Sequence, residues 1–273
     1  MPGLAVAGRL AYDRGMATGG KKRGGAKGGG RSGKAGGSRA GGSTVAGGSG
    51  SSGRGLTQRV KSARGRKLGS TRWLQRQLND PYVQEAQRLG YRSRAAFKLL
   101  QIDERFGLLR SGQRVVDLGA APGGWLQVAA GLMKLTDPSH GGVLVGLDLS
   151  EIEPVAGAVI LQSDFTDAAA PGRLRDALGG PADVVLSDMA VATTGHAATD
   201  HLRTIALAEM AVDFAFEVLK PGGSLAIKVF QGADEPALFE RIRTRFASVR
   251  RFKPKASRSD SVEMFIVATG FAG

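Results

Sequence analysis

The segment from Arg114 to Gln127, RVVDLGAAPGGWLQ, has the residue types that let a protein backbone approach a ligand closely. An apolar, β-branched run is followed by small residues and glycines, and Trp125 then opens an apolar-periodic stretch, which predicts strand, tight turn and helix. Small side chains leave the backbone accessible, and the first turn of a helix offers free N–H groups. A dinucleotide fingerprint would need glycine at position 121, where this chain has Ala121. The corner therefore indicates a nucleotide-like cofactor on an α/β sheet, without the nicotinamide pattern.

Three carboxylates, Asp148, Asp164 and Asp188, lie at or just after the ends of apolar runs over 142–148, 158–162 and 182–188. The carboxyl ends of parallel strands meet at one edge of a sheet, so we expect these acids to surround the glycine corner. One such acid is commonly a turn residue, whereas a coordinated set is better explained by a cofactor site. Asp148 is expected to hold ribose hydroxyls, and Asp164 could meet an adenine amino group.

Lys228 lies inside the apolar run SLAIKVF, over 224–230. A lysine in such a buried strand is costly unless it is paired or reaches a cleft, so we interpret it as functional. Lys98 lies in the predicted helix that begins near Ser93, its expected N-cap, and taken alone it would be an ordinary solvated lysine.

The elements that must position these residues alternate between strands and helices. Helical patterns are expected up to Gly90 from about 71, then over about 93–102, 124–133, 199–219 and 236–247, and the last strand over 261–268. This order predicts a doubly wound α/β sheet that ends in a hairpin, with helices on both faces.

The positive charge is concentrated at one end of the chain. The 273 residues carry a net charge of +14, and residues 1–69 alone hold fifteen Lys or Arg and a single acid, Asp13. That glycine-rich segment cannot bury enough apolar surface to fold, so we expect a disordered basic extension over 1–69 and a folded domain over 70–273. The extension could add salt-sensitive affinity for RNA or serve only as a solubilising leader, and both readings stay open.

Several classes of protein are excluded by composition. The chain has no cysteine, which rules out disulfides, thiolate metal sites and a cysteine nucleophile. Its three histidines show no ligand spacing, so we assign no metal. No apolar run reaches about 18 residues and no secretory signal is present, so we expect no membrane association and a cytoplasmic location.

A set of motifs in order along residues 72–270 resembles the FtsJ/RrmJ family of ribosomal RNA 2′-O-methyltransferases. They are YRSRAAFKL, VVDLGAAPGGW, the D-L-x-x-x-x-P that starts at Asp148, SDF, SDMA, LKPGGS, IKVFQG and VEMFIVATG. The resemblance implies a Rossmann-like, class I methyltransferase fold, with a seven-stranded, mostly parallel sheet whose last strand is antiparallel. It also implies S-adenosylmethionine as cofactor and methylation of a uridine ribose in large-subunit (23S) rRNA, on the ribosomal subunit late in assembly.

The same resemblance implies the site residues. A catalytic tetrad falls on Lys98, Asp188, Lys228 and Glu263, and cofactor contacts fall on Gly123, Trp125, Asp148, Asp164 and Asp188. The residue patterns flag the three aspartates and Lys228 independently, whereas Lys98 rests on the resemblance. We expect Lys228 to be the proton acceptor or oxyanion stabiliser, because a ribose hydroxyl must lose its proton while it attacks an electrophilic methyl group. The family usually has proline after SDMA, where this chain has Val191.

The expected partner is large-subunit rRNA or the large ribosomal subunit, bound by a monomer through basic flanks over 72–94 and 241–258. The second flank has eight basic residues and no acid. Two alternatives stay open: a tRNA 2′-O-methyltransferase, which keeps the same tetrad, and a ribosome-assembly factor that binds RNA without catalysis.

Overall fold

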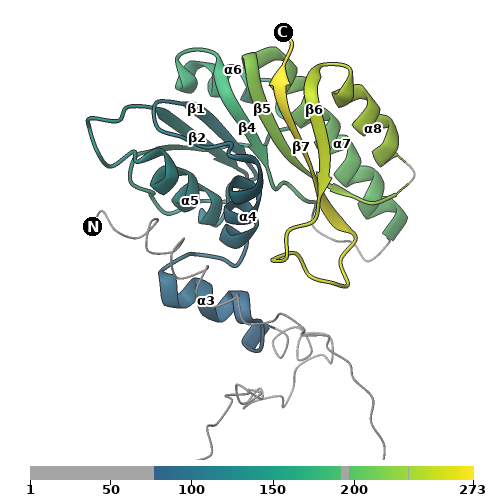
Figure 1. The fold of residues 1–273 in the computed structure, drawn as a ribbon, viewed down its shortest axis with the longest axis horizontal. Helices are drawn as coiled ribbons and strands as arrows, with labels where there is room; N and C mark the ends of the chain where they lie inside the picture. Colours follow the sequence, from purple (N-terminus) through teal and green to yellow (C-terminus); the bar gives the residue numbers. More distant parts are fainter. Residues whose placement is uncertain (1–76, 192–196, 233) are drawn as a thin grey trace, which may run out of the picture.

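A computed structural model describes residues 77–191, 197–232 and 234–273 of the chain, and every structural statement here concerns these residues. One sheet of seven strands runs through them in the order β3-β2-β1-β4-β5-β7-β6 (Figure 1). The strands are β1 Arg114–Leu118, β2 Val143–Asp148, β3 Ala158–Gln162, β4 Ala182–Ser187, β5 Leu219–Phe230, β6 Phe246–Phe252 and β7 Glu263–Phe271. β7 pairs antiparallel with both of its neighbours, and the other pairings are parallel, so the expected sheet is confirmed.

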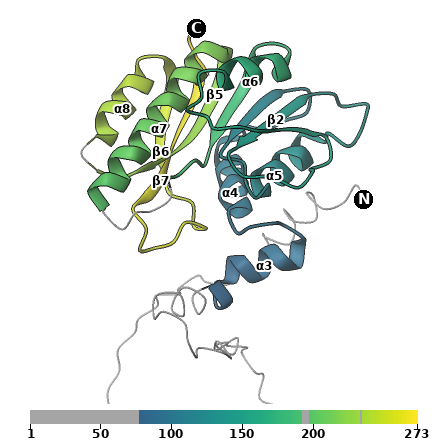
Figure 2. The same cartoon turned by 180° about the vertical axis from the view of Figure 1, so that it is seen from behind.

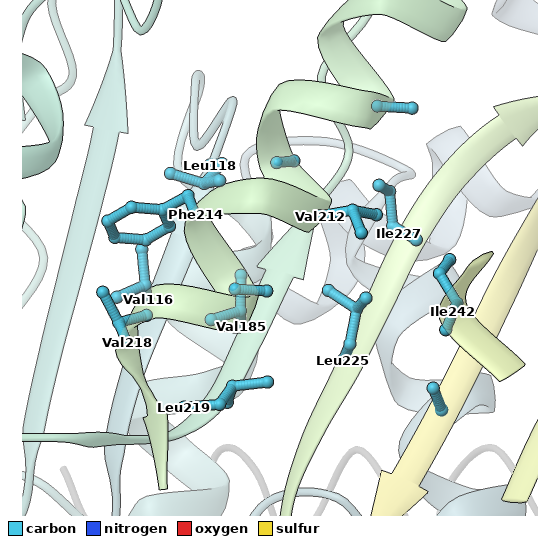
Figure 3. Packing of buried hydrophobic residues seen from close by; sticks show 14 of the residues in the cluster. Val116, Leu118, Val185, Val212, Phe214, Val218, Leu219, Leu225, Ile227 and Ile242 are labelled. Atoms are coloured by element: carbon cyan, nitrogen blue, oxygen red, sulfur yellow. The ribbon is translucent and has the colours of Figure 1, made fainter. Parts of the chain in front are cut away.

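Helices pack on both faces of this sheet (Figures 1 and 2). They are α4 Ala96–Phe106, α5 Gly124–Met133, α6 Ala170–Leu178, α7 Ala197–Val218 and α8 Glu235–Arg243. The remaining helix, α3 Pro81–Leu89, lies beyond α4, farther from the sheet. Alternate side chains of the central strands enter two separate cores: Val116 packs on the side of α6, α7 and α8, and Val115 on the side of α4 and α5. Figure 3 shows the first core, where Val212 and Phe214 of α7 cover the sheet. The near-continuous apolar strands of the sequence reflect this two-sided burial.

The order in which strands are added to the sheet reverses between β1 and β4, and this position determines where a ligand can bind. From β1 the chain adds β2 and β3 on one side, then returns to add β4 and β5 on the other. In open α/β sheets a ligand crevice forms where such crossovers diverge, outside the carboxyl ends of the strands, and this end of the sheet is called the crevice edge here. β7 begins at the same edge, since Glu263 pairs with Phe230 at the end of β5. The sequence-predicted site residues therefore converge on one edge of the sheet.

Three sequence expectations are corrected by local geometry. The helical stretch expected from about 71 to Gly90 is interrupted: residues 77–78 are helical, and α3 begins anew at Pro81, where Asp80 caps it through a bond from the Tyr82 amide. Residues 71–76 lie outside the described part. Ser93 is not the N-cap of α4, whose cap position is Ala95, and its hydroxyl instead packs on Gly124. The helix expected over 236–247 ends at Arg243, because the chain then turns into strand β6.

The domain boundary expected at residue 69 and the basic extension 1–69 lie outside the described residues. Within the described ranges, no helix is both long enough and apolar enough to cross a bilayer.

Candidate active site

The glycine corner after β1 is tied to the end of β2. The amides of Gly119 and Ala120 both donate to the carbonyl oxygen of Leu147, at 2.9 and 3.2 Å. Gly119 has a left-handed φ of 77°, and a Cβ there would lie 2.7 Å from the Met189 side chain, so the position requires glycine. Gly123, at φ 106°, precedes the first turn of α5. The corner thus leads directly into α5, whose first turn has N–H groups without intrahelical partners.

Asp148 lies directly against this corner. Its Oδ2 accepts a bond from the Ala121 amide at 2.9 Å, and its Oδ1 accepts one from the Ser150 amide at 2.8 Å. Asp164 is exposed after β3, where its Oδ1 accepts bonds from the amide and hydroxyl of Thr166. Those two bonds lower the pKa of Asp164, so it is a turn carboxylate that stays ionised.

Trp125 is a core residue in this structure. Its side chain is buried, its indole N–H donates to the Ala95 carbonyl oxygen at 2.8 Å, and its ring lies 5.7 Å from that of Phe265. The indole therefore joins α5 to α4 and β7.

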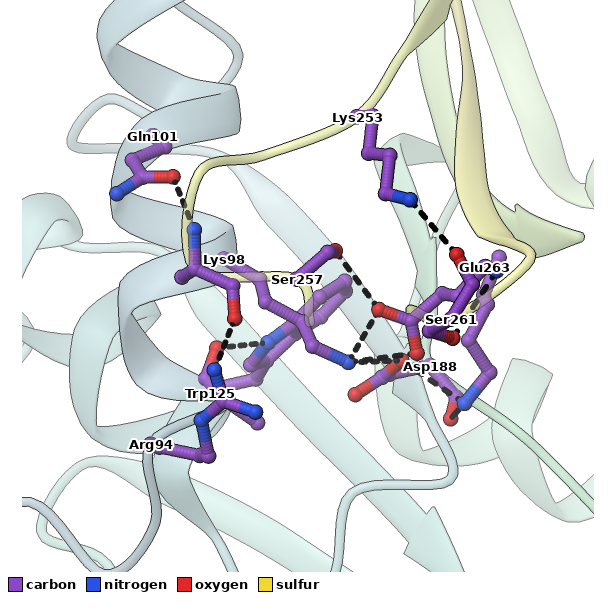
Figure 4. Close-up of polar contacts among 12 residues, drawn as sticks. Arg94, Lys98, Gln101, Trp125, Asp188, Lys253, Ser257, Ser261 and Glu263 are labelled. Carbon is purple, nitrogen blue, oxygen red and sulfur yellow. Dashed lines mark hydrogen bonds and ion pairs between the residues drawn. The ribbon is translucent and has the colours of Figure 1, made fainter. Parts of the chain in front are cut away.

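Four side chains, from α4, β5, β7 and the residue after β4, meet at the carboxyl end of β4. Figure 4 labels three of them, Lys98, Asp188 and Glu263. Lys228 Nζ of β5 lies 3.0 Å from Asp188 Oδ1 and donates to the Asp188 carbonyl oxygen at 2.6 Å. Lys98 Nζ of α4 lies 3.5 Å from the same Oδ1 and 2.8 Å from each carboxylate oxygen of Glu263. The structure thus brings together the four residues that the family resemblance implies, two cations alternating with two anions.

The electrostatics of this cluster are set by its burial and by its pairing. The Lys228 side chain is only 6% exposed, and it is tolerated inside β5 because both of its contacts are to Asp188. Burial alone would raise the pKa of Asp188, but the ammonium groups of Lys228 and Lys98 together hold it below its usual value. Asp188 is therefore a permanent anion at neutral pH, and it fixes both lysines.

The loop between β6 and β7, residues 253–262, supplies contacts that sequence reasoning missed. Ser257 is buried, and its hydroxyl donates to Glu263 Oε1 at 2.8 Å, while the Glu263 amide donates to the Ser261 hydroxyl at 3.1 Å. The loop is held against α4 by a bond from the Ala256 amide to Gln101. Nothing in the residue pattern distinguishes Ser257 from the neighbouring serines, so only the tertiary contacts identify it.

Comparison with known proteins decides the family. A model of the FtsJ-like methyltransferase family matches residues 91–271, about two thirds of the chain. The chain belongs to the FtsJ-like methyltransferase family. It is a methyltransferase that uses S-adenosylmethionine, and the methyltransferase fold expected from the sequence is confirmed.

Individual relatives agree with this assignment. The chain is 61% identical over 218 residues to ribosomal RNA large subunit methyltransferase E of Paramagnetospirillum magneticum, covering 80% of this chain and 89% of that protein. It is 59% identical over 216 residues to the protein of the same name from Maricaulis maris, covering 79% and 75%. A solved structure of a provisionally assigned ribosomal RNA methyltransferase from Plasmodium falciparum aligns with a TM-score of 0.60 at 26% identity, over 67% of this chain and 100% of that one.

The residues of this FtsJ-like methyltransferase fit a cofactor that carries positive charge. Asp117, at the end of β1, is fully buried, and neither of its carboxylate oxygens has a hydrogen-bond partner. Burial first, and then the charges of Asp188 and Asp148, raise the pKa of Asp117 well above its usual value. S-adenosylmethionine has a sulfonium and an ammonium group, and this crevice concentrates carboxyl groups beside a corner without bulky side chains.

The two basic flanks are already engaged in internal contacts at several positions. Arg88 pairs with Glu85, and Arg94 bridges Asp80 and the Ala256 carbonyl oxygen. In the second flank the ion pairs are Arg241 with Asp213, Arg243 with Glu240 and Arg251 with Glu235. Lys253, Lys255 and Arg258 lie in the 253–262 loop that borders the tetrad, where Lys253 Nζ donates to the Ser261 carbonyl oxygen at 2.7 Å. This loop therefore places basic side chains beside the tetrad.

Proposed function

We propose that this methyltransferase transfers a methyl group to the 2′-hydroxyl of a uridine in large-subunit ribosomal RNA. The observation that carries the proposal is the paired cluster of Lys98, Asp188, Lys228 and Glu263 beside the glycine corner. The names of the relatives at 54–61% identity support ribosomal RNA as the substrate.

We propose that the cofactor lies along the crevice edge, from the corner to Asp188. The backbone at Gly123 and Trp125 would approach its methionine part, Asp148 would accept bonds from the ribose hydroxyls, and Asp164 would meet the adenine amino group. Bound there, S-adenosylmethionine supplies an electrophilic methyl group. The backbone amides of Ala121 and Ser150 already orient the Asp148 carboxylate, which supports its part in this arrangement.

The reaction requires the hydroxyl oxygen to lose its proton as it attacks in line with the methyl–sulfur bond. Lys228 would accept that proton as a neutral amine, or as an ammonium it would stabilise the developing oxyanion, because its Nζ is held at the crevice edge by the two Asp188 contacts. Asp188 would orient Lys228 and border the methyl group. Lys98 and Glu263 would position the ribose, since their two side chains are fixed against each other at 2.8 Å.

We further propose that the RNA reaches the tetrad across the 253–262 loop, whose basic residues Lys253, Lys255 and Arg258 can contact phosphates. A polyanion partner is supported by the net charge of +14. The natural substrate would be the large ribosomal subunit late in its assembly, bound by a single copy of the chain.

The deciding experiment is transfer of labelled methyl from S-adenosylmethionine to unmodified large subunits, free large-subunit rRNA and bulk tRNA. A methyl on the 2′-oxygen blocks alkaline cleavage of the adjacent phosphodiester, so the product is an alkali-resistant dinucleotide. We expect that product from the subunit or its rRNA, formed far more slowly with Lys228→Ala. Label confined to tRNA would identify the protein as a tRNA 2′-O-methyltransferase. No label anywhere, with cofactor still bound, would favour an RNA-binding assembly factor.

A further inference from the structure

Arg92 lies in the short segment between α3 and α4, and its guanidinium contacts three backbone carbonyl oxygens. Nη1 donates to the Glu153 oxygen at 2.6 Å and to the Pro122 oxygen at 3.2 Å. Nη2 donates to the Pro154 oxygen at 2.8 Å. The Arg92 side chain is 20% exposed, so neighbouring residues cover most of it.

These carbonyls belong to two loops that leave the sheet at the crevice edge. Pro122 is in the glycine corner after β1, one residue before Gly123. Glu153 and Pro154 are in the loop that follows β2 and therefore begins at Asp148. One guanidinium thus joins the loop that contains Gly123 to the loop that directly follows Asp148.

The fit between Arg92 and Gly123 is close. A Cβ on Gly123 would lie 2.6 Å from Arg92 Nη1, so the guanidinium fills the space that any side chain at this position would need. The backbone of Arg92 is held as well: its amide donates to Gln127 Oε1 of α5 at 2.9 Å, and Gln127 Nε2 donates to the Gly90 oxygen at 3.0 Å. Both ends of the residue are therefore attached to the glycine corner and its helix.

We propose that Arg92 is a positioning residue of the cofactor site, which holds the corner loop and the β2 loop at the spacing that S-adenosylmethionine requires. The inference rests on the proposed cofactor contacts of Gly123 and Asp148. It reassigns an arginine that the charge pattern had placed in an RNA-binding flank over 72–94.

The chemistry of the side chain supports this assignment over a phosphate contact. A guanidinium offers five N–H donors in a rigid plane, which suits several carbonyl oxygens held at fixed positions. Three of the five donors already meet carbonyl oxygens in charge-assisted bonds, which are stronger than neutral ones, so at most two remain for a phosphate unless those bonds break. A lysine ammonium lacks the fork and could not meet all three oxygens at once.

The test compares Arg92→Ala and Arg92→Lys in the full-length protein, with Arg110→Ala as the matched control at an exposed position. Calorimetry gives the Kd of S-adenosylmethionine, steady-state kinetics give KM and kcat, and rRNA binding is measured over a salt series. We expect Arg92→Ala to raise the cofactor Kd and KM about tenfold or more, the effect of losing a set of charge-assisted hydrogen bonds. Arg92→Lys should lie between Arg92→Ala and the wild type. RNA affinity and its salt slope should match those of Arg110→Ala.

An unchanged cofactor Kd in Arg92→Ala, together with weaker RNA binding and a salt slope reduced by about 1, would overturn the inference and assign Arg92 to a phosphate. An Asp148→Asn variant separates this failure from failure of the proposed cofactor site. If Asp148→Asn weakens cofactor binding and the Arg92 variants do not, only the inference is wrong. If neither does, the cofactor placement is wrong as well. Should Arg92→Ala unfold, the Arg92→Lys variant decides on the same measurements.

Discussion

The ammonium group of Lys228 contacts Asp188 twice, through the side-chain Oδ1 at 3.0 Å and through the backbone carbonyl oxygen at 2.6 Å. The second contact cannot rotate away with the side chain, so it fixes Nζ relative to the end of β4. A buried lysine in the centre of a sheet thereby gains a defined position at the crevice edge, with one direction left for a substrate hydroxyl.

Lys228→Ala is expected to lower kcat by about 10²–10⁴-fold, the range for loss of a positioned acid–base group, while the cofactor Kd changes little. The matched control is Lys220→Ala on the same strand, because Lys220 pairs with Asp183 at the far end of β5. Single-turnover methylation and calorimetry measure the two effects. Full turnover in Lys228→Ala would exclude it as the proton acceptor.

Ser257→Ala is expected to lower kcat about fivefold to tenfold without changing the cofactor Kd. Loss of its hydroxyl removes one hydrogen bond to Glu263, a change of about 1 kcal/mol. Ser257→Thr should restore most of the rate because it keeps the hydroxyl. Ser259→Ala, at an exposed position in the same loop, should leave kcat unchanged. Equal rates for the two alanine variants would contradict a role for Ser257 in positioning Glu263.

Asp117 gives the cofactor-free protein a pH-dependent stability. Its raised pKa means that the folded chain keeps the proton after the unfolded chain has lost it. Stability therefore falls as pH rises above the usual aspartate pKa, and it keeps falling until the folded pKa is reached. Asp117→Asn should remove this component and raise Tm at pH 7–8 without cofactor.

Thermal unfolding at pH 5 and pH 8 checks this prediction, with the exposed Asp176→Asn as control. The gain from Asp117→Asn should be larger at pH 8 than at pH 5. A gain that is equal at both values would show that Asp117 does not hold a proton in the folded state.

Gly119→Ala is expected to destabilise the protein more than Gly112→Ala. Both glycines have nearly the same left-handed φ, 77° and 80°, which costs a non-glycine residue about 1–2 kcal/mol. Only at Gly119 does a Cβ also collide with Met189; at Gly112 the nearest atom is 3.9 Å away. The difference between the two free energies of unfolding, measured in urea, should be about 1–3 kcal/mol. Equal losses of unfolding free energy in the two variants would mean that the corner shifts enough to accommodate a Cβ beside Met189.

Affinity for rRNA should fall steeply with salt, and more steeply for the full-length chain than for residues 70–273. Residues 1–69 hold fifteen basic side chains, each able to displace a counterion from RNA phosphates. Plots of log K against log salt for the two proteins measure the difference. Identical slopes would assign the extension no part in RNA binding.

Much of the fold could be predicted from the sequence, because buried strands and amphipathic helices leave periodic patterns that depend only on neighbouring residues. The runs that end at Asp148 and Asp188 and the glycine corner are of this kind, and the structure places them at one edge. The sequence also predicts a functional role for Lys228, because a lysine in an apolar strand needs a partner. The helical pattern around Lys98 predicts no such role, because only the fold brings Lys98 to its partners Asp188 and Glu263.

Only the tertiary structure decided what the individual polar side chains contact. Arg92 and the carbonyl oxygen of Glu153 are 61 positions apart in the sequence, and Lys98 and Glu263 are 165 apart. Charge counting therefore assigned Arg92 and Arg94 to an RNA-binding flank, whereas the fold directs both to backbone carbonyls. Periodicity determined the strands and helices of this protein, while the pairing of charges across those elements depended on how the sheet brings distant segments together.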